Sequence, residues 1–584
     1  MKKGISPVVA TALLLVVAVV AVVGFNSWFN QYQSTTLSSV EQSSQNSGSL
    51  EIDTLIGSTL YIKNPTSTNL SLGIVKIGGK SCTINQKFGK GGFGVDLSSC
   101  LNVSAGVQEI TIISNTSVRS KKVFVKSTIS PSFVPKNNGT IVWARAINSS
   151  LYDYGYGITV DSVGNFYGIG VYGNNVSLGN GIVLPVSTGG YDAFVIKFNK
   201  SGTPQWAKRV NSTGDEDGRS VAVDSLGNVY TTGNYGGAGP INLGNGVILP
   251  TKTGFYDAYV IKYNSGGVAQ WAKRINSSAS SNYGRGIALD SNNNVYAVGY
   301  YQNGPINLGN GVILPAATAS FDAYLIKYNN SGTAQWVKRV NSTGPDYGYG
   351  IAIDSTNNIY VSGAYQGFVN LTNNVVLPVP TGGSDAFIVK YSSTGVPQWS
   401  KRVNSSLSDS ANAIALDSSN NVFTTGYYMG GIIALGNGVT LPASSGSEDV
   451  FIVKLDSSGT ALWAKRINST QTDLGNGITV DSTGAVYVTG SYRNSLINLG
   501  NSITLPLPTS DDAFIVKYDT SGLAQWADRI GAPGPDNGYG IDVDNLGNIF
   551  VAGSYNSGSI NLGSGIILPL PPGGNANGFF LKTQ

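Results

Sequence analysis

Acidic and amide side chains recur at one position in seven similar segments of the chain. Each lies eight residues before a second recurring aspartate, and the set is Asp153, Glu216, Asn282, Asp346, Asp409, Asp473 and Asp536. Clustered carboxylate oxygens bind hard cations such as Ca²⁺, so a fold that gathered the six acids would create a cation ring. The alternative is that each residue caps a turn beside its neighbouring glycines. We keep Ca²⁺ as the one candidate ligand of this set and predict no other cofactor.

A second periodic set consists of asparagines that begin Asn-Ser-Ser or Asn-Ser-Thr. Asn-x-Ser/Thr is the acceptor for glycans in exported proteins. Repetition of one ancestral segment, or chance in a chain rich in Asn, Ser and Thr, would produce the same pattern without any modification. The candidate glycosylation sites are Asn148, Asn211, Asn276, Asn341, Asn404 and Asn468.

Residue types that support catalysis are few. The chain has no histidine, which removes the commonest general base and the commonest metal ligand. An enzyme acting on polysaccharide needs a non-repeating cluster of carboxylates, tyrosines or metal ligands. Glu216, Glu448 and Asp511 depart from the repeat, but they are isolated in the sequence. We therefore expect a binding protein and not an enzyme.

The composition narrows the class of partner. Charged residues make up 12% of the 584 residues and the net charge is +4, against a usual charged share of about 25%. No long basic run is present, so we expect no nucleic-acid partner. The 76 glycines suit short strands joined by tight turns.

The elements that carry these residues repeat. Seven tryptophans, Trp143, Trp206, Trp271, Trp336, Trp399, Trp463 and Trp526, follow one another at intervals of 63 to 65 residues. Each unit reads as four strands, which we name A to D, with an arm between B and C. Radial repetition of four-stranded units is typical of a β-propeller. The sequence therefore predicts a mainly β fold with a seven-bladed propeller over residues 141–584.

The two ends of the array predict ring closure. The chain enters with a D strand at residues 141–147 and leaves with A, B and C, the last around Phe580. The first strand would complete the last blade and hide an open edge. In this ring the long B–C arms and the D–A connections share one face. The arm tips differ between copies, at residues 236–240, 302–305 and 429–431, so we expect recognition there.

The repeated segments resemble the β-propeller repeat (SBBP-type) family of bacterial and archaeal surface proteins. The resemblance lies in the hairpin of the Gly-Ile-Ala-Val-Asp-Ser-x-Gly-Asn-Val-Tyr-x-x-Gly type, in the Asp-Ala-Phe-x-x-Lys-Tyr strand and in the Trp-x-Lys-Arg strand. It covers residues 143–584. It implies the propeller fold and no single activity.

The N-terminus predicts export. Lys2 and Lys3 precede an uncharged, mostly apolar stretch over residues 5–25, which is just long enough to span a bilayer with the rest of the chain outside. A cleaved secretory signal is the alternative. The Lys-Lys-Gly-Ile-Ser-Pro-Val-Val run resembles the class III signal of archaeal type IV pilins. That resemblance implies cleavage between Gly4 and Ile5 and retention of the helix in a membrane or filament.

Four segments precede the repeats. We expect a signal and membrane helix at 1–30, a stalk at 31–48, a small β-sandwich at 49–127 and a linker at 128–140. Cys82 and Cys100 are the only cysteines, and on an exported chain they predict one disulfide. Two separate buried thiols are the alternative.

Together these patterns predict a single-pass protein of the cell membrane with its C-terminal domains outside, acting as an adhesin or minor pilin-like subunit. The expected partners are the membrane, other pilin subunits, and glycans or cell surfaces. An extracellular enzyme acting on polysaccharide and a purely structural surface component are the alternatives.

Overall fold

The computed structural model describes the backbone of seven strands between residues 51 and 125, and residues 139–584 apart from 278, 279 and 446. The chain divides into two compact units, Met1–Lys136 and Asn137–Gln584. Within the described residues no helix is long and apolar enough to cross a membrane. The predicted membrane helix, the Gly4–Ile5 cleavage site and the stalk lie outside the described residues, as does Cys100.

The first unit contains two antiparallel sheets, in the orders β1-β2-β5 and β4-β3-β6-β7. Its strands are β1 (Glu51–Ile56), β2 (Thr59–Asn64), β3 (Leu70–Ile77), β4 (Lys80–Phe88), β5 (Gly91–Asp96), β6 (Gly106–Ile113) and β7 (Val118–Val125). Cys82 lies in β4. The short strands expected over this range are therefore present.

The second unit is a seven-bladed β-propeller, and each blade is a four-stranded antiparallel sheet in the order A-B-C-D. The A strands are β9 (Tyr154–Val160), β15 (Glu216–Val223), β21 (Asn282–Leu289), β27 (Tyr347–Ile353), β33 (Ser410–Leu416), β39 (Leu474–Val480) and β45 (Asn537–Val543). The B strands are β10 (Phe166–Tyr172), β16 (Val229–Tyr235), β22 (Val295–Tyr301), β28 (Ile359–Tyr365), β34 (Val422–Tyr428), β40 (Val486–Arg493) and β46 (Ile549–Tyr555).

The C and D strands, which form the outer half of each blade, also recur in all seven blades. The C strands are β13 (Asp192–Phe198), β19 (Asp257–Tyr263), β25 (Asp322–Tyr328), β31 (Asp385–Tyr391), β37 (Asp449–Leu455), β43 (Asp511–Tyr518) and β49 (Asn577–Thr583). The D strands are β14 (Pro204–Val210), β20 (Ala269–Ile275), β26 (Ala334–Val340), β32 (Pro397–Val403), β38 (Ala461–Ile467), β44 (Ala524–Ile530) and β8 (Ile141–Ile147). Blades 1 to 7 are numbered by their A strands.

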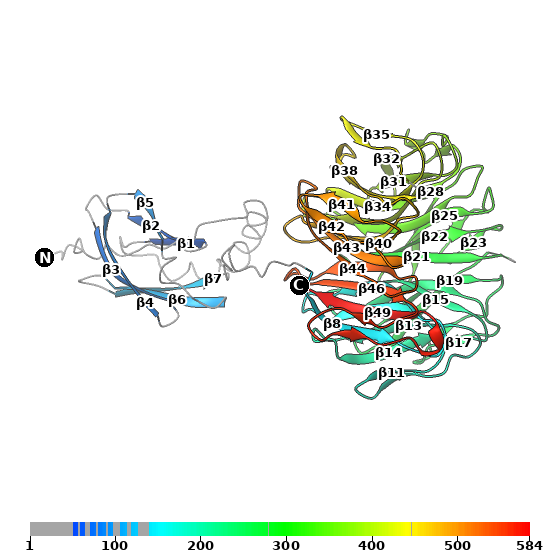
Figure 1. The fold of residues 1–584 in the computed structure, drawn as a ribbon, viewed down its shortest axis with the longest axis horizontal. Helices are drawn as coiled ribbons and strands as arrows, with labels where there is room; N and C mark the ends of the chain where they lie inside the picture. Colours follow the sequence, from blue (N-terminus) through cyan, green and yellow to red (C-terminus); the bar gives the residue numbers. More distant parts are fainter. Residues whose placement is uncertain are drawn as a thin grey trace. The chain divides into compact units, whose positions relative to one another are not determined.

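The ring closes as the sequence predicts. Strand β8, the first of the propeller, pairs with β49, the last, with Arg145 opposite Phe580 and Trp143 opposite Lys582, and the two lie side by side in Figure 1. Each A strand contacts the A strands of both neighbouring blades, and β45 contacts β9. The A strands therefore surround the propeller axis.

Contacts between blades explain the recurring tryptophans. The Trp206 indole donates a hydrogen bond of 3.0 Å to the Ser265 carbonyl, in the C–D turn of the next blade. A Cβ on Gly267 of the same turn would lie 2.8 Å from the Trp206 ring, and this residue has φ +76°. Glycine is therefore required where one blade packs on the next. The recurring tyrosines at the ends of the B strands are also buried, as in Tyr235, so their role is packing.

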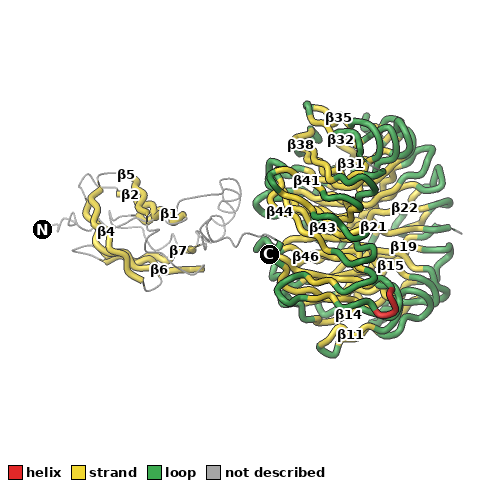
Figure 2. Tube along the Cα trace, in the orientation of Figure 1, coloured by secondary structure: helices red, strands yellow, loops and turns green. Residues whose placement is uncertain are grey.

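The arms between strands B and C are small hairpins, two of which are marked by β35 at the top and β11 at the bottom of the propeller in Figure 2. They are β11 (Val176–Gly179) with β12 (Ile182–Leu184), β17 (Ile241–Asn242) with β18 (Ile248–Leu249), β23 (Ile306–Asn307) with β24 (Ile313–Leu314), β29 (Val369–Asn370) with β30 (Val376–Leu377), β35 (Ile433–Gly436) with β36 (Val439–Leu441), β41 (Ile497–Gly500) with β42 (Ile503–Leu505), and β47 (Ile560–Asn561) with β48 (Ile567–Leu568). A short helical turn, η4 (Pro572–Gly574), follows β48.

The two parts of each arm lie in different places: its first residues, where recognition was expected, stay beside the D–A loop, as in the bond of 3.0 Å from the Ala238 amide to the Thr213 hydroxyl, whereas its hairpin packs on the blade. Each hairpin folds back along the outer D strand of its own blade, as β18 does on β20. The Asn245 side chain in the hairpin turn donates to the Ala269 carbonyl at the start of β20, at 2.9 Å. Leu249 is fully buried in the blade core with Ile241 and Ile261. Burial of this apolar face holds the hairpins down, so they cover the outer strands.

Candidate axial binding site

The structure does not bring the six predicted ring acids together. Each is buried in its own blade and accepts hydrogen bonds from the D–A loop. The Asp153 carboxylate accepts from the Ser149 amide at 2.6 Å and hydroxyl at 2.8 Å, and from the Gly173 amide at 3.1 Å after strand B. The described residues hold no group of three or more His, Cys, Asp or Glu side chains that could bind a metal ion. The geometry is that of a loop cap and not of a Ca²⁺ ring.

Burial has the largest effect on the pKa values of these acids. It raises the pKa of Asp153, Glu216, Asp346, Asp409 and Asp473 to about 7, and that of Asp536 to about 8, against the lowering effect of the hydrogen bonds. Blade 3 has the neutral Asn282 at the same position, also fully buried. Charge is therefore not required at this position.

The periodic Asn-Ser pairs belong to the same loops. The serine that follows each asparagine is buried, and the set is Ser149, Ser212, Ser277, Ser342, Ser405 and Ser469. The asparagines themselves are partly buried. The side-chain amides of Asn211, Asn276 and Asn468 donate to the hydroxyls of Thr188, Thr253 and Ser445. Loop packing thus gives a structural reason for Asn211, Asn276 and Asn468, whereas Asn148, Asn341 and Asn404 share only the partial burial and the buried serine that follows them.

Every A strand contains a β-bulge, which changes the direction of one side chain. In blade 1 the pairing of β9 with β10 skips a residue between Gly155 and Gly157, and the same shift occurs in the other six blades. Bulges commonly direct side chains into functional sites. The skipped residues are Tyr156, Arg219, Arg285, Tyr349, Asn412, Asn476 and Tyr539.

Contacts between neighbouring blades involve several of these bulge residues. The Tyr156 ring lies 5.2 Å from the Tyr539 ring of blade 7, and the Arg219 guanidinium of blade 2 lies 4.0 Å from the Tyr156 ring centroid. The Asn412 and Asn476 amides donate to backbone carbonyls of the following A strand. The bulge residues therefore form one ring around the axis.

The residues two positions earlier add a second layer on the same face as the D–A loops. They are Tyr154, Asp217, Tyr283, Tyr347, Ser410, Leu474 and Asn537, and all but the buried Ser410 are partly exposed. Tyr300 from β22 joins them, at ring distances of 4.9 Å from both Tyr283 and Tyr347. We call the two layers and Tyr300 the axial cluster.

The residue types of the axial cluster differ between one side of the ring and the other. Blades 1 to 4 supply tyrosines and two arginines, whereas blades 5 and 6 supply Ser410, Asn412, Leu474 and Asn476. Residues ahead of the C strands extend this contrast, because Tyr256 and Phe321 lie against Tyr283, at 5.9 and 6.3 Å. Blades 1 to 4 are thus richer in aromatic and cationic residues. Blades 5 and 6 carry mostly polar residues, together with Leu474, with Tyr427 at the position of Tyr300, and with Glu448 and Asp511 at the positions of Tyr256 and Phe321.

Titratable groups near the axis are held in their neutral or paired forms. Burial raises the pKa of Tyr154 to about 12 and raises those of Tyr156 and Tyr349 further. Asp217 forms an ion pair of 2.9 Å with Arg219. Burial also raises the pKa of Asp542 to about 6; this residue lies farther along β45 and bonds to Thr159 and Val160 of blade 1. Tyr154, Tyr156 and Tyr349 therefore keep their hydroxyl protons near neutral pH and can donate hydrogen bonds.

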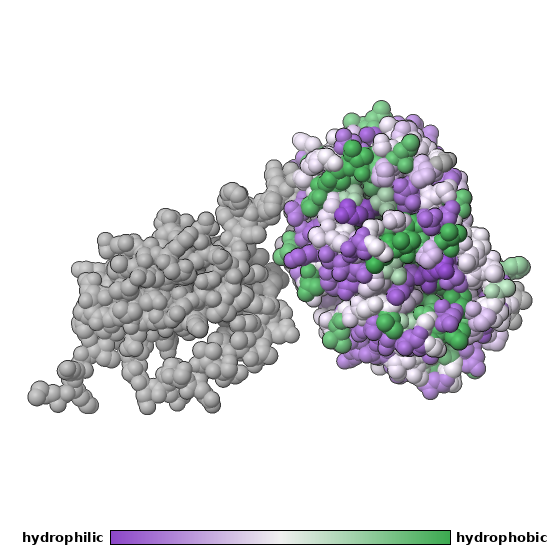
Figure 3. Space-filling view, turned by 90° about the horizontal axis from the view of Figure 1, so that it is seen from below, coloured by the Kyte–Doolittle hydropathy of each residue, from purple (hydrophilic) through white to green (hydrophobic). Residues whose placement is uncertain are grey.

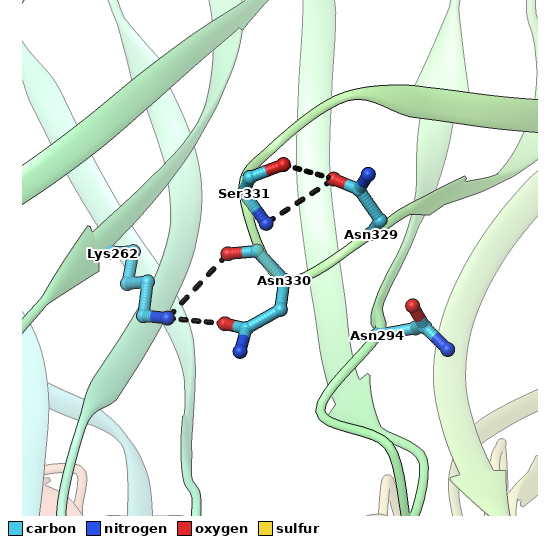
Figure 4. A pocket seen from close by; sticks show the side chains of 5 residues that line it. All are labelled: Lys262, Asn294, Asn329, Asn330 and Ser331. Carbon is cyan, nitrogen blue, oxygen red and sulfur yellow. Dashed lines mark hydrogen bonds between the residues drawn. The ribbon is translucent and has the colours of Figure 1, made fainter.

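A pocket of about 430 Å³ lies at the opposite end of the blades, and Figure 4 shows its lining residues. Lys262 of blade 2 donates to Asn330 in the C–D turn of blade 3. Lys327, Lys390 and Lys454 make the same bond to the following C–D turns, at 3.2 to 3.4 Å. The pocket therefore belongs to the repeated packing between blades.

The sequence indicates the axial cluster through positions that vary among the seven repeats, and not through the recurring residues. The bulge position and the position two residues before it change from copy to copy, whereas the residue between them is glycine or alanine in every copy. Residues that the fold requires are constant among the copies of a repeat. Inner positions that vary are therefore available for recognition. Alignment of the seven copies by the glycines would have found them.

Comparisons with known proteins agree with this architecture. The family described as a beta-propeller repeat, SBBP, matches residues 205–234, 270–300, 335–363 and 525–561. These segments are β-propeller repeats. Over 514 residues, 73% of this chain, it is 24% identical to an uncharacterized WD repeat-containing protein of Acanthamoeba polyphaga mimivirus. Over 114 residues, 19% of this chain, it is 29% identical to the regulatory protein FlaEY of Caulobacter vibrioides. The matches span 37% and 12% of those two proteins.

Similar solved structures include a protein of unknown function from Dyadobacter fermentans, with a TM-score of 0.35 and 10% identity, covering 77% of this chain and all of that one. An apocarotenoid oxygenase from Synechocystis has a TM-score of 0.31 and 10% identity, covering 73% of this chain and 91% of the oxygenase.

Proposed function

We propose that this chain is a surface binding protein whose axial cluster recognises a partner. The N-terminal segment anchors it in the cell membrane or a pilus, so that it acts as an adhesin or minor pilin-like subunit. A β-propeller is a rigid scaffold suited to a binding or structural role. The recognition site comes from residues that the repeat does not constrain.

The observation that carries this proposal is the contrast inside each A strand. The bulge has the same geometry in all seven blades, but the residue at its apex is Tyr, Arg or Asn. Tyr and Arg are enriched at binding hot spots. Figure 3 shows apolar and polar residues interspersed on the side of the propeller that faces the viewer.

The binding test compares the full-length chain with a variant carrying Tyr154→Ser, Tyr156→Asn, Tyr283→Ser and Arg285→Asn. These substitutions give blades 1 and 3 the Ser410 and Asn412 pair of blade 5, which the fold already accommodates. We expect the full-length chain to bind ligands on a glycan array and to promote cell adhesion, and the variant to lose both with an unchanged melting temperature. Equal binding by the two proteins would reject the axial site.

The location test uses cell fractionation. We expect the full-length chain in membranes or sheared filaments, and release of the protein when residues 1–25 are deleted. Full-length protein found soluble in the cytoplasm would refute the surface role. This outcome is independent of whether the axial cluster binds a ligand.

An enzyme acting on polysaccharide is the second candidate. The tyrosines and arginines of the axial cluster break the repeat as such a site would. However, burial raises the pKa of Tyr154 to about 12, and a good general base has a pKa near the working pH. We therefore propose binding without turnover. Sustained release of shorter products from an acidic polysaccharide, abolished by Tyr154→Phe, would overturn this choice.

A further inference from the structure

We propose that the axial cluster binds the carboxylate of a uronic acid unit in an acidic polysaccharide. This inference rests on the proposed function and adds the chemical class of the ligand. Three features of the described residues carry it: cations that lack a full set of partners, aromatic rings at the same place, and polar groups on the facing blades.

Arg285 is the first feature. Its guanidinium lies over the rings of Tyr283 and Tyr300, at 5.7 and 5.2 Å from their centroids, and it donates to the Tyr300 hydroxyl. It forms no ion pair with any residue that the structure describes, and its Nε is buried without a hydrogen-bond partner. A buried donor without a partner costs free energy. An incoming carboxylate would supply the anion and the acceptor together.

Arg219 supports the same site from blade 2. Asp217 accepts from one of its terminal nitrogens at 2.9 Å, but its Nε is also buried without a partner. Its guanidinium stacks 4.0 Å from the Tyr156 ring centroid, and this contact fixes the plane of the guanidinium. Because Asp217 already balances this charge, Arg285 is the principal anion-binding residue and Arg219 is an additional donor.

Aromatic rings provide a surface for a flat, partly apolar ring. Tyr152, Tyr154 and Tyr156 lie nearly parallel, with successive centroids 6.5 and 5.6 Å apart. Tyr152 is 41% exposed, whereas Tyr154 and Tyr156 are partly exposed. On the other side of Arg285, the Tyr347 and Tyr349 rings lie parallel at 6.0 Å. The C–H faces of a pyranose can pack on such rings while its hydroxyls reach their edges.

Polar groups on the facing blades complete the match. Asn476 and Asn537 lie in the A strands of blades 6 and 7. The Asn476 amide already donates to the Gly538 carbonyl, so the partly exposed Asn537 and the Asn476 side-chain oxygen are the groups of these blades that remain for sugar hydroxyls. A neutral sugar would leave the Arg285 charge desolvated without an anion. A polyglutamate chain could satisfy the arginines but has no flat ring for the tyrosines. A uronate satisfies both kinds of group.

The test is titration calorimetry on the full-length chain with three probes: a galacturonate tetramer, a neutral galactose tetramer and polyglutamate. We expect binding of the galacturonate tetramer alone, weakening as salt is raised because charge pairs are screened. Arg285→Asn should lower the affinity at least roughly tenfold. Arg285→Lys should recover part of this loss, because it restores the charge without the planar fork.

Two controls separate binding from folding. Asn412 and Asn476 occupy the Arg285 position in blades 5 and 6, so Arg285→Asn introduces a residue that the bulge accepts. Lys200→Gln removes one positive charge from the exposed C–D turn of blade 1 on the opposite face and should leave the affinity unchanged. Both variants should keep the wild-type melting temperature.

Equal affinity for the neutral tetramer or for polyglutamate would overturn the proposal, as would an Arg285→Asn variant that binds galacturonate normally. No binding of galacturonate would also overturn it. If the glycan array then gave another ligand whose binding requires the axial residues, the proposed function would stand and only the uronate assignment would fall.

Discussion

At the scale of single residues, the propeller separates structural positions from recognition positions within one short strand. In six blades an acid bridges a D–A loop to the residue after the recurring tyrosine of strand B, and in blade 3 Asn282 occupies the same fully buried position. Three residues later the bulge residue faces the axis and varies. The recurrence of the first position was visible in the sequence. Its burial was not, because spacing alone does not distinguish a cap inside a blade from a ligand at the axis.

Asp409 provides a test of the cap. Its carboxylate accepts from the Ser405 amide at 2.6 Å, from the Ser405 hydroxyl at 2.7 Å and from the Met429 amide at 3.2 Å. Asp409→Leu leaves these buried donors unsatisfied and should cost about 3 kcal/mol in unfolding free energy. Asp409→Asn, which copies Asn282 of blade 3, should cost about 1 kcal/mol or less. Urea denaturation measures both, and equal losses would contradict the cap.

The raised pKa of Asp409 predicts a pH dependence with a definite sign. Burial raises it to about 7 from a model-compound value of 3.8, so the folded state binds a proton that the unfolded state releases between these values. Stability from this group is therefore lost as pH rises from about 4 to about 7. Asp409→Asn has no such proton, so its stability relative to wild type should improve between pH 5 and pH 8. A difference that stays constant over this range would refute the shift.

At the scale of elements, the strands and their order were predictable, whereas the path of the arms was not. The four-strand unit, the turn aspartates and the closing strand follow from hydrophobic alternation and repetition. The arm was expected on one face because alternating strand directions place the B–C and D–A connections on the same side. Its direction depends on the burial of Leu249 and on the bond from Asn245 to Ala269, which are tertiary contacts between segments about twenty residues apart.

A pair of neighbouring residues tests whether the arm is packed. Leu249 is fully buried, whereas Ile248 is 52% exposed. Leu249→Ala should lower the unfolding free energy by roughly 2 to 5 kcal/mol, because it leaves a cavity in the blade core. Ile248→Ala should change it by less than about 0.5 kcal/mol. Thermal or urea unfolding gives both values, and a small effect at Leu249 would show that the arm is free.

At the scale of the whole molecule, ring closure turns seven similar sheets into one site. Strand β8 supplies the buried Ile141, Trp143 and Ile147 to blade 7, and β45 and β9 then meet at the axis. Without closure, Tyr539 would lose its neighbour Tyr156. The seam was predictable because the first and last segments of the array are complementary parts of one repeat.

Chains truncated at the N-terminus test whether β8 closes the ring by pairing with β49. A chain that begins at Asn148 lacks β8, exposes the edge of β49 and should lose at least about 5 kcal/mol or aggregate. A chain that begins at Gly139 keeps β8 and should remain a monomer with the wild-type melting temperature. Size-exclusion chromatography and calorimetry distinguish them. Identical behaviour of the two chains would contradict closure by β8.

The central claim is that recognition occurs at the axial cluster. Tyrosine nitration followed by mass spectrometry tests it most directly, because the tyrosines at the ends of the B strands are buried whereas Tyr154, Tyr283 and Tyr347 are partly exposed. The account predicts that a saturating ligand, the galacturonate tetramer or another ligand from the glycan array, slows nitration of these three residues. Unchanged nitration of all three with the ligand bound would contradict it.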